Sequence, residues 1–141
     1  MRSNSIAISV HIDAPIDKVW QSLSDWESQG EWMLATRIWV TSEIRIGIGT
    51  QIQAFTGVGT LGVLDTMCVT SWNPPFSADV EHTGALIKGS GRFELVALSA
   101  ERTRFNWSEE IIAPRFIFLA IWPGIYCGVR LSLLRFARTF R

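Results

Sequence analysis

The sequence predicts an α+β fold, in which one antiparallel sheet carries helices on one side. Three features of the chain indicate this class. Apolar and polar residues alternate over residues 6–12, which is the period of a strand with one buried face. Residues 35–111 hold consecutive strand-like runs separated by short polar or glycine-rich turns. After Pro114 the apolar spacing becomes that of a helix.

A short helix is expected directly after the first strand. Pro15 suits the first position of a helix and Asp17 suits its first turn, so we expect the helix to begin near Pro15 and to end near Asp25. A second short helix or turn is expected from Asp25 to Trp32, since Gly30 limits its length. The apolar stripe of the first helix is Ile16, Val19, Trp20 and Leu23.

The middle of the chain is expected to form about six consecutive strands, because it is rich in β-branched and aromatic residues. Asn73-Pro74-Pro75 ends the third of these strands, since proline cannot donate to a ladder. The segment GVGTLG, residues 57–62, lacks the Lys-Ser/Thr ending of a phosphate loop and is interpreted as a hairpin or bulge. The six runs are TRIWVTSE, GIGTQIQAFTG, TLGVLDTMCVTSWNPP, SADVEHTG, IKGSGRFELVAL and RTRFNWSEEI.

The last element is predicted to be a long helix from Ile125 to Arg141. The most apolar window precedes it, from Phe116 to Cys127, and is broken by Pro123-Gly124. That window is shorter than the ~20 apolar residues of a spanning helix, so no stable membrane insertion is predicted. Transient contact with a membrane is the alternative interpretation of this segment.

Composition bounds the classes of function. We expect a single domain, residues 1–141, because a chain of 141 residues with 48% hydrophobic residues can bury a sizeable core. A formal net charge of zero gives no general attraction to nucleic acid, which is not expected as a partner. Cys68 and Cys127 lack the spacing of metal ligands and are predicted to be buried free thiols, so no metal and no cofactor is indicated. The N-terminus lacks the apolar core of a signal peptide, which makes the cytoplasm the expected location.

Several segments together resemble the START-like (SRPBCC) superfamily, in its polyketide cyclase/dehydrase branch. They are HIDAPIDKVWQSLSDWESQGEW, GVLDTMCVTSWNPP, GSGRFEL and TRFNWSEE, in an order that covers nearly the whole chain. The resemblance implies a helix-grip fold: a seven-stranded antiparallel sheet wrapped round a long C-terminal helix, with a deep apolar cavity between them. Members of the superfamily bind lipids, sterols, aromatic polyketides, plant hormones or quinones, and some cyclise or dehydrate polyketides. The fold alone does not decide among these activities.

Strand parity selects polar residues that face the expected cavity. Glu109 shares a face with the aromatic residues of its strand, and His82 shares a face with Val80. A carboxylate and an imidazole in apolar surroundings have shifted pKa values and can act as general acid and base. Glu109 and His82, with Asp65, are therefore candidate catalytic or orienting residues. The alternative is that they satisfy one another, a backbone group or water without any catalysis.

Large aromatic side chains are the candidates for the cavity wall, because they give apolar area and flat faces suited to rings. The alternative for each of them is that it only fills the core. The candidates are Trp32, Trp39, Phe55, Phe93, Trp107 and Trp122.

Three functions follow from these observations. The leading hypothesis is a protein that binds a small hydrophobic molecule, lipid-like or of the aromatic polyketide kind, in an internal cavity. The second is a cyclase or dehydratase that uses Glu109 and His82, so the sequence leaves open whether the protein is an enzyme. The third is an interaction protein, with a weak homodimer or membrane contact through Phe116 to Cys127.

Overall fold

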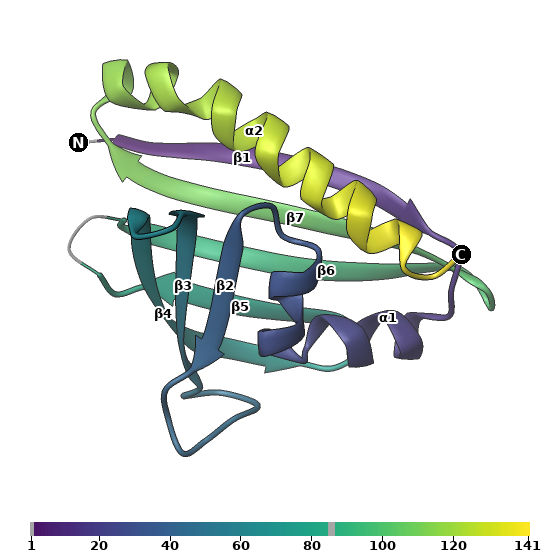
Figure 1. Cartoon of the computed structure of the whole chain (residues 1–141). Coiled ribbons are helices and arrows are strands. Elements are labelled where there is room, and N and C mark those ends of the chain that lie inside the picture. The colour runs from purple at the N-terminus through teal and green to yellow at the C-terminus, as the bar shows by residue number, and fades with distance from the viewer. Residues whose placement is uncertain (1, 85–86) are drawn as a thin grey trace.

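The computed structural model describes residues 2–84 and 87–141 and confirms the predicted α+β class. Its strands form one seven-stranded antiparallel sheet in the order β1-β7-β6-β5-β4-β3-β2. A long helix, α2, crosses one face of this sheet above β1 and β7 (Figure 1). This is the helix-grip arrangement that the resemblance implied. That the chain is one domain remains a prediction. The strands are β1 Arg2–Ile12, β2 Thr36–Val40, β3 Gln51–Val58, β4 Leu61–Asn73, β5 Ser77–His82, β6 Gly89–Ser99 and β7 Arg102–Ala113.

Two helical segments connect β1 to β2, as expected. Helix α1 spans Ile16–Leu23 and follows Pro15, and its buried residues are the predicted stripe members Val19, Trp20 and Leu23. The segment from Trp26 to Glu31 is a 3-10 helix, η1. It buries Trp26 toward the sheet, so it closes one end of the space between the sheet and α2.

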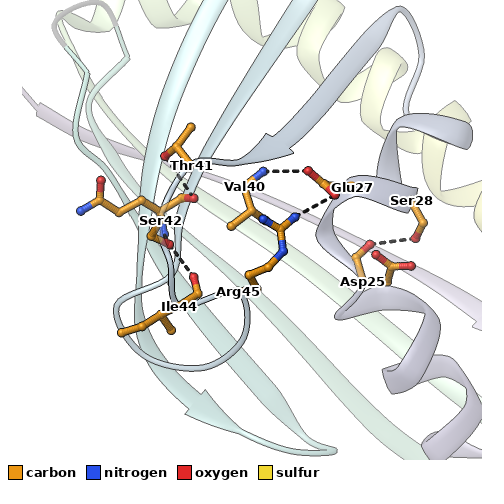
Figure 2. A network of polar contacts seen from close by, with 9 residues as sticks. Asp25, Glu27, Ser28, Val40, Thr41, Ser42, Ile44 and Arg45 are labelled. Atoms are coloured by element: carbon orange, nitrogen blue, oxygen red, sulfur yellow. Dashed lines mark hydrogen bonds and ion pairs between the residues drawn. The ribbon is translucent and has the colours of Figure 1, made fainter.

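An exposed polar network holds η1 against the strand that follows it. The Glu27 carboxylate accepts hydrogen bonds from the Val40 backbone N–H at 3.2 Å and from the Arg45 guanidinium at 2.9 Å (Figure 2). The bond from Val40, with the Arg45 charge, lowers the pKa of Glu27. The network therefore fixes η1 relative to β2 and to the loop of residues 41–50.

The core lies between the inner face of the sheet and the second half of α2. Phe105 of β7 and Phe136 of α2 are fully buried, with ring centroids 5.8 Å apart in an edge-to-face arrangement. Trp32 also packs on Phe136, with ring centroids 4.6 Å apart. Such ring pairs add about 0.5–1.5 kcal/mol beyond area burial. The inward residues of β1 are the alternating set expected from the sequence: Ile6, Ile8, Val10 and Ile12.

The prediction for the last helix was wrong about its start. Helix α2 runs from Arg115 to Arg138, so it begins ten residues before Ile125 and contains Pro123. A proline inside a helix removes the bond to the carbonyl four residues earlier, that of Leu119. Leu119 and Pro123 are both exposed, so this carbonyl lies on the exposed side of the helix, where the lost bond costs least.

The longer helix also changes what the apolar window means. Within the described residues, Arg115–Arg138 is long and apolar enough to cross a membrane by length and composition, and 17% of its most apolar window is buried. The expectation that Pro123-Gly124 breaks this segment is therefore incorrect. The core helix of a soluble protein passes the same test when it is mostly buried, but the first half of α2 is mostly exposed.

The hairpin prediction for residues 57–62 is confirmed, since β3 and β4 are joined there. Gly57 lies opposite Gly62, and a Cβ on Gly57 would come within 2.1 Å of the Leu61 carbonyl oxygen. The strands therefore approach more closely at this turn than any larger residue allows.

The expectation of two buried thiols was wrong: both cysteines are free, but Cys68 is half-buried and Cys127 is exposed.

Candidate functional site

A cavity of about 440 Å³ lies between the inner face of the sheet, η1 and α2. Its walls are mostly apolar and come from every strand except β1, as well as from both η1 and α2. One end is closed by Trp26 and Trp32, and Gly124 and Ile125 of α2 lie along its side. A volume of this size falls within the range of small-molecule sites.

One cluster of ionisable side chains lies in this mostly apolar cavity, and it contains the three candidates selected from the sequence. His82 of β5 lies between two carboxylates: its Nδ1 is 2.8 Å from Asp65 Oδ1, and its Nε2 bonds Glu109 Oε1. All three side chains are mostly buried. These are the only charged or titratable side chains among the lining residues that the structure describes, so the wall carries two acids, one histidine and no lysine or arginine.

The protonation of the cluster follows from these bonds. Burial on its own lowers the pKa of His82, but the hydrogen bonds and charges of Asp65 and Glu109 outweigh it and raise the pKa of His82 to about 10. Only the imidazolium has an N–H on both ring nitrogens, as bonds to two carboxylates require. Burial raises the pKa of the Glu109 carboxyl, and the bond to His82 opposes that rise only in part.

A glycine makes this cluster possible. Glu109 lies directly opposite Gly91 of β6, and Gly91 lies opposite Val80 of β5. A Cβ on Gly91 would be 2.6 Å from Glu109 Oε2. The Glu109 side chain therefore crosses β6 above this glycine to reach His82 on β5. Sequence reasoning missed Gly91, although the spacing of Gly89 and Gly91 in the strand was the signal for it.

Both ring nitrogens of His82 are hydrogen-bonded to carboxylates, so Asp65 and Glu109, and not His82, are the members of the cluster that can bind a ligand. A ligand in the cavity has no free imidazole nitrogen to meet. The carboxylate oxygens not bonded to His82 are the charged acceptors left in the wall, beside the neutral side chains of Gln29, Thr36, Thr56 and Ser132. Glu109 Oε2 lies next to Gly91, which itself lines the cavity. The described residues include no group of three or more side chains placed to hold a metal ion.

Three of the six aromatic candidates line the cavity: Trp32, Phe93 and Trp107. Trp32 and Trp26 keep buried indole N–H groups without a hydrogen-bond partner, so ring packing holds this end of the cavity. Sequence reasoning did not select Trp26, although it lies in the same tryptophan-rich segment as Trp32.

The other three aromatic candidates lie elsewhere, which corrects their expected place in the cavity wall. Trp39 is exposed and donates its indole N–H to Gln53 at 3.1 Å. Phe55 lies on the outer face of the sheet, under the Arg37 guanidinium at 5.2 Å from the ring centre. Trp122 is exposed on α2 and packs on Tyr126. Ile38 and Ile52 are the inward members of β2 and β3, because strand alternation turns their neighbours outward.

Comparisons with known proteins place this fold among START-like proteins. Neither a protein-family model nor a curated protein matches the sequence. The structure is similar to that of the Zhui aromatase/cyclase from a Streptomyces species, with a TM-score of 0.80, 16% identity, and coverage of 98% of this chain and 93% of that one. A START superfamily protein from Mycobacterium smegmatis gives a TM-score of 0.75 at 13% identity over 92% of this chain and 93% of that one.

A third solved structure widens the comparison. The Aha1 dimer from Colwellia psychrerythraea has a TM-score of 0.70 and 17% identity, with coverage of 97% of this chain and 96% of that one. At such identities the similarity shows the fold and not the activity. The chain therefore has the START-like, polyketide-cyclase type of helix-grip fold, which is compatible with ligand binding or with cyclase activity.

Proposed function

We propose that this protein binds a small hydrophobic molecule in the cavity and orients it by a hydrogen bond to the Glu109 carboxyl group. The observation that carries the proposal is the cluster of Asp65, His82 and Glu109, the only ionisable side chains among the described residues of a mostly apolar cavity wall. Burial of an apolar ligand contributes roughly 25 cal/mol per Å² before the costs of association. One fixed acceptor then selects the orientation.

The charges of the cluster narrow the class of ligand. The described lining residues offer two carboxyl groups and no cation other than His82, which both carboxyl groups already engage. A carboxylate or phosphate on the ligand would enter an apolar space with no positive partner, which is costly. We therefore propose a neutral aromatic or lipid-like molecule with a hydroxyl or another hydrogen-bond donor.

A cyclase or dehydratase is the second candidate, and the bonded state of His82 favours a particular division of labour. Glu109 would accept a proton from a carbon next to a ketone to leave an enolate, and the same carboxyl group would give that proton to the departing hydroxyl as the carbon–oxygen bond breaks and the double bond forms, which releases water and restores the carboxylate. In this reaction Glu109 contacts the substrate and His82 is a positioning residue. Recovery of a bound compound unchanged, with no turnover of added ketones, separates binding from catalysis.

Native mass spectrometry of the purified protein, followed by denaturation, is the first test. We expect one small apolar compound per chain. In parallel, Nile red, a neutral dye, should bind with a stoichiometry of one, whereas a dansylated fatty acid should bind at least about tenfold more weakly. Equal affinity for the two dyes would contradict the proposed charge selection, and failure to take up any apolar molecule would contradict the binding function.

Two glycine variants test the role of the cluster. Gly91→Ala and Gly128→Ala each add one methyl group to the cavity wall, but only the first meets Glu109 Oε2. At Gly128 no atom beyond the neighbouring residues and the backbone of the helix itself lies within 4 Å of the added carbon. We expect Gly91→Ala to weaken retention of the native compound by about tenfold, the effect of losing a charged hydrogen bond, and Gly128→Ala to change it little. Equal effects of the two substitutions would mean that only the volume of the cavity matters.

The proposed cytoplasmic location is tested separately, by cell fractionation.

A further inference from the structure

Two segments that carry exposed apolar side chains, the turn of the β3–β4 hairpin and the first half of α2, lie at the same end of the molecule (Figure 1). At the turn of the β3–β4 hairpin, Val58 and Leu61 are 80% and 82% exposed. On the first half of α2, Phe116 is 75% exposed, and Leu119 and Trp122 are also exposed. We call these five residues the rim patch. A concentration of exposed apolar side chains of this kind marks an interaction site.

The rim patch lies beside the opening of the cavity. Val63 of the hairpin lines the cavity and is itself 43% exposed. Gly124 and Ile125 of α2 line the cavity two and three residues after Trp122. The cavity therefore reaches the surface between the hairpin and α2. A hydrophobic molecule that enters or leaves there passes directly between the two halves of the rim patch.

The first half of α2 is apolar on most of its circumference. Residues 116–129 contain no charged side chain, a run of about 21 Å at 1.5 Å per residue. Exposed apolar residues at positions 116, 117, 119, 121 and 122 point in different directions round the helix axis, because successive residues turn by about 100°. One side of this part of the helix is packed on the protein through the buried Phe118. A protein partner covers one further side, whereas the headgroups and acyl chains of one leaflet can contact all the exposed sides of a helix that lies in the interface. This distribution favours lipid.

Cations flank the apolar run. Arg115 and Arg130 stand at its two ends, and Lys88 is exposed beside Ile112, whose N–H donates to the Lys88 carbonyl. The chain carries five arginines and no acid after Glu110. Glu110 keeps its negative charge, since the hydroxyls of Ser3 and Ser5 donate to its carboxylate and lower its pKa, so the excess of cations lies on the α2 side of this acid. Basic side chains next to an apolar surface favour anionic lipid headgroups.

We propose that the rim patch docks on the surface of an anionic lipid bilayer, with the first half of α2 in the interface and the cavity opening toward the hydrocarbon. The bilayer then gives a hydrophobic ligand an apolar route into the cavity. The docking goes beyond ligand binding and rests on different residues, so either can fail without the other. It involves contact with one leaflet, not a spanning helix.

Flotation with vesicles tests this proposal on the full chain. We expect the protein to float with vesicles of phosphatidylcholine and phosphatidylglycerol, and to do so less at high ionic strength or with phosphatidylcholine alone. The double variants Val58→Ser/Leu61→Ser and Phe116→Ser/Leu119→Ser should each lower the partition coefficient at least about tenfold. Since the replaced side chains are exposed, the melting temperature should change little.

A matched control is available at the other end of β3. Ile46 and Ile48, in the loop of residues 41–50, are 60% and 63% exposed and lie away from the rim patch (Figure 1). The variant Ile46→Ser/Ile48→Ser should float as the unmodified protein does. Equal flotation of the rim-patch variants, or loss of flotation in the control variant as well, would overturn the proposal.

The competing occupant of the rim patch is a second copy of this chain, the homodimer considered from the sequence. Light scattering in lipid-free buffer distinguishes it. A monomer that floats with vesicles supports the proposal. A stable dimer that does not float, and that the Phe116→Ser/Leu119→Ser variant dissociates, would assign the surface to a second copy and overturn it.

Discussion

His82 belongs to the candidate site and also contributes to the free energy of unfolding of the protein. It is bonded on both sides by carboxylates, and its folded pKa of about 10 lies above the ordinary value of 6.5. In the folded chain His82 keeps its proton at neutral pH, whereas in the unfolded chain it loses most of it. The folded state therefore binds one more proton than the unfolded state between these two values.

This difference predicts how stability depends on pH. The contribution of His82 is fully present below pH 6.5 and is lost as the pH rises toward 10, at a rate of at most about 1.4 kcal/mol per pH unit. The raised pKa of Glu109 acts in the same direction at lower pH, because the folded state again holds the proton more tightly. Urea unfolding at several pH values from 6.5 to 8.5 measures this slope.

The control for the slope is the other histidine. His82→Gln should remove most of the decline in the free energy of unfolding, because it removes the group that holds the extra proton. His11, exposed on β1, is replaced in the matched variant His11→Gln, which should keep the slope of the unmodified protein. The same slope in both variants would show that His82 is not held as an imidazolium.

At the scale of elements, α2 is a long helix that lacks one backbone hydrogen bond in its interior. Pro123 removes one helical bond, and yet the helix continues through it from Arg115 to Arg138. The second half packs on the sheet through Leu133 and Phe136, which are fully buried. The first half carries the exposed apolar residues, so the two halves of one helix face different surroundings.

Pro123→Ala should stabilise the protein. Alanine restores the bond to the Leu119 carbonyl and removes the ring from the helix interior, and the flexibility gained by the unfolded chain offsets part of this. We expect the free energy of unfolding to rise by about 2 kcal/mol, measured by urea unfolding. Pro114→Ala is the control, since Pro114 is the N-cap residue of α2 and interrupts no helical bond. Equal effects of the two changes would contradict this account.

At the scale of the whole molecule, the cavity couples ligand binding to folding. Only the folded chain brings together strands from β2 to β7 and helix α2 around the ligand. A ligand at one hundred times its dissociation constant should therefore raise the free energy of unfolding by about 2.7 kcal/mol, and the melting temperature by roughly 8 °C. Calorimetry with the compound recovered from the protein measures this shift. A melting temperature that saturating compound leaves unchanged would place the compound outside the folded cavity.

Strand and helix periods made much of the fold predictable. The alternation in β1 and the stripe of α1 follow from which side chains share a face, and the resemblance supplied the seven-stranded sheet wrapped round a C-terminal helix. The alternation of a strand does not say which of its two faces looks inward. At β3 the large aromatic side chain was therefore wrongly expected to face the cavity. There the pair Ile52 and Ala54 faces the cavity, and the larger Phe55 faces out.

In the candidate site too, some features could be predicted from the sequence and others could not. The sequence by itself determined that Glu109 shares a face with the aromatic residues of its strand and that His82 shares a face with Val80, because alternation is a local property of the backbone. Only the tertiary structure decided that they meet across Gly91, that His82 is bonded on both sides, and that α2 leaves its first half uncovered. Those features depend on strand order, register and the position of the helix on the sheet, which are set by contacts between residues far apart in the chain.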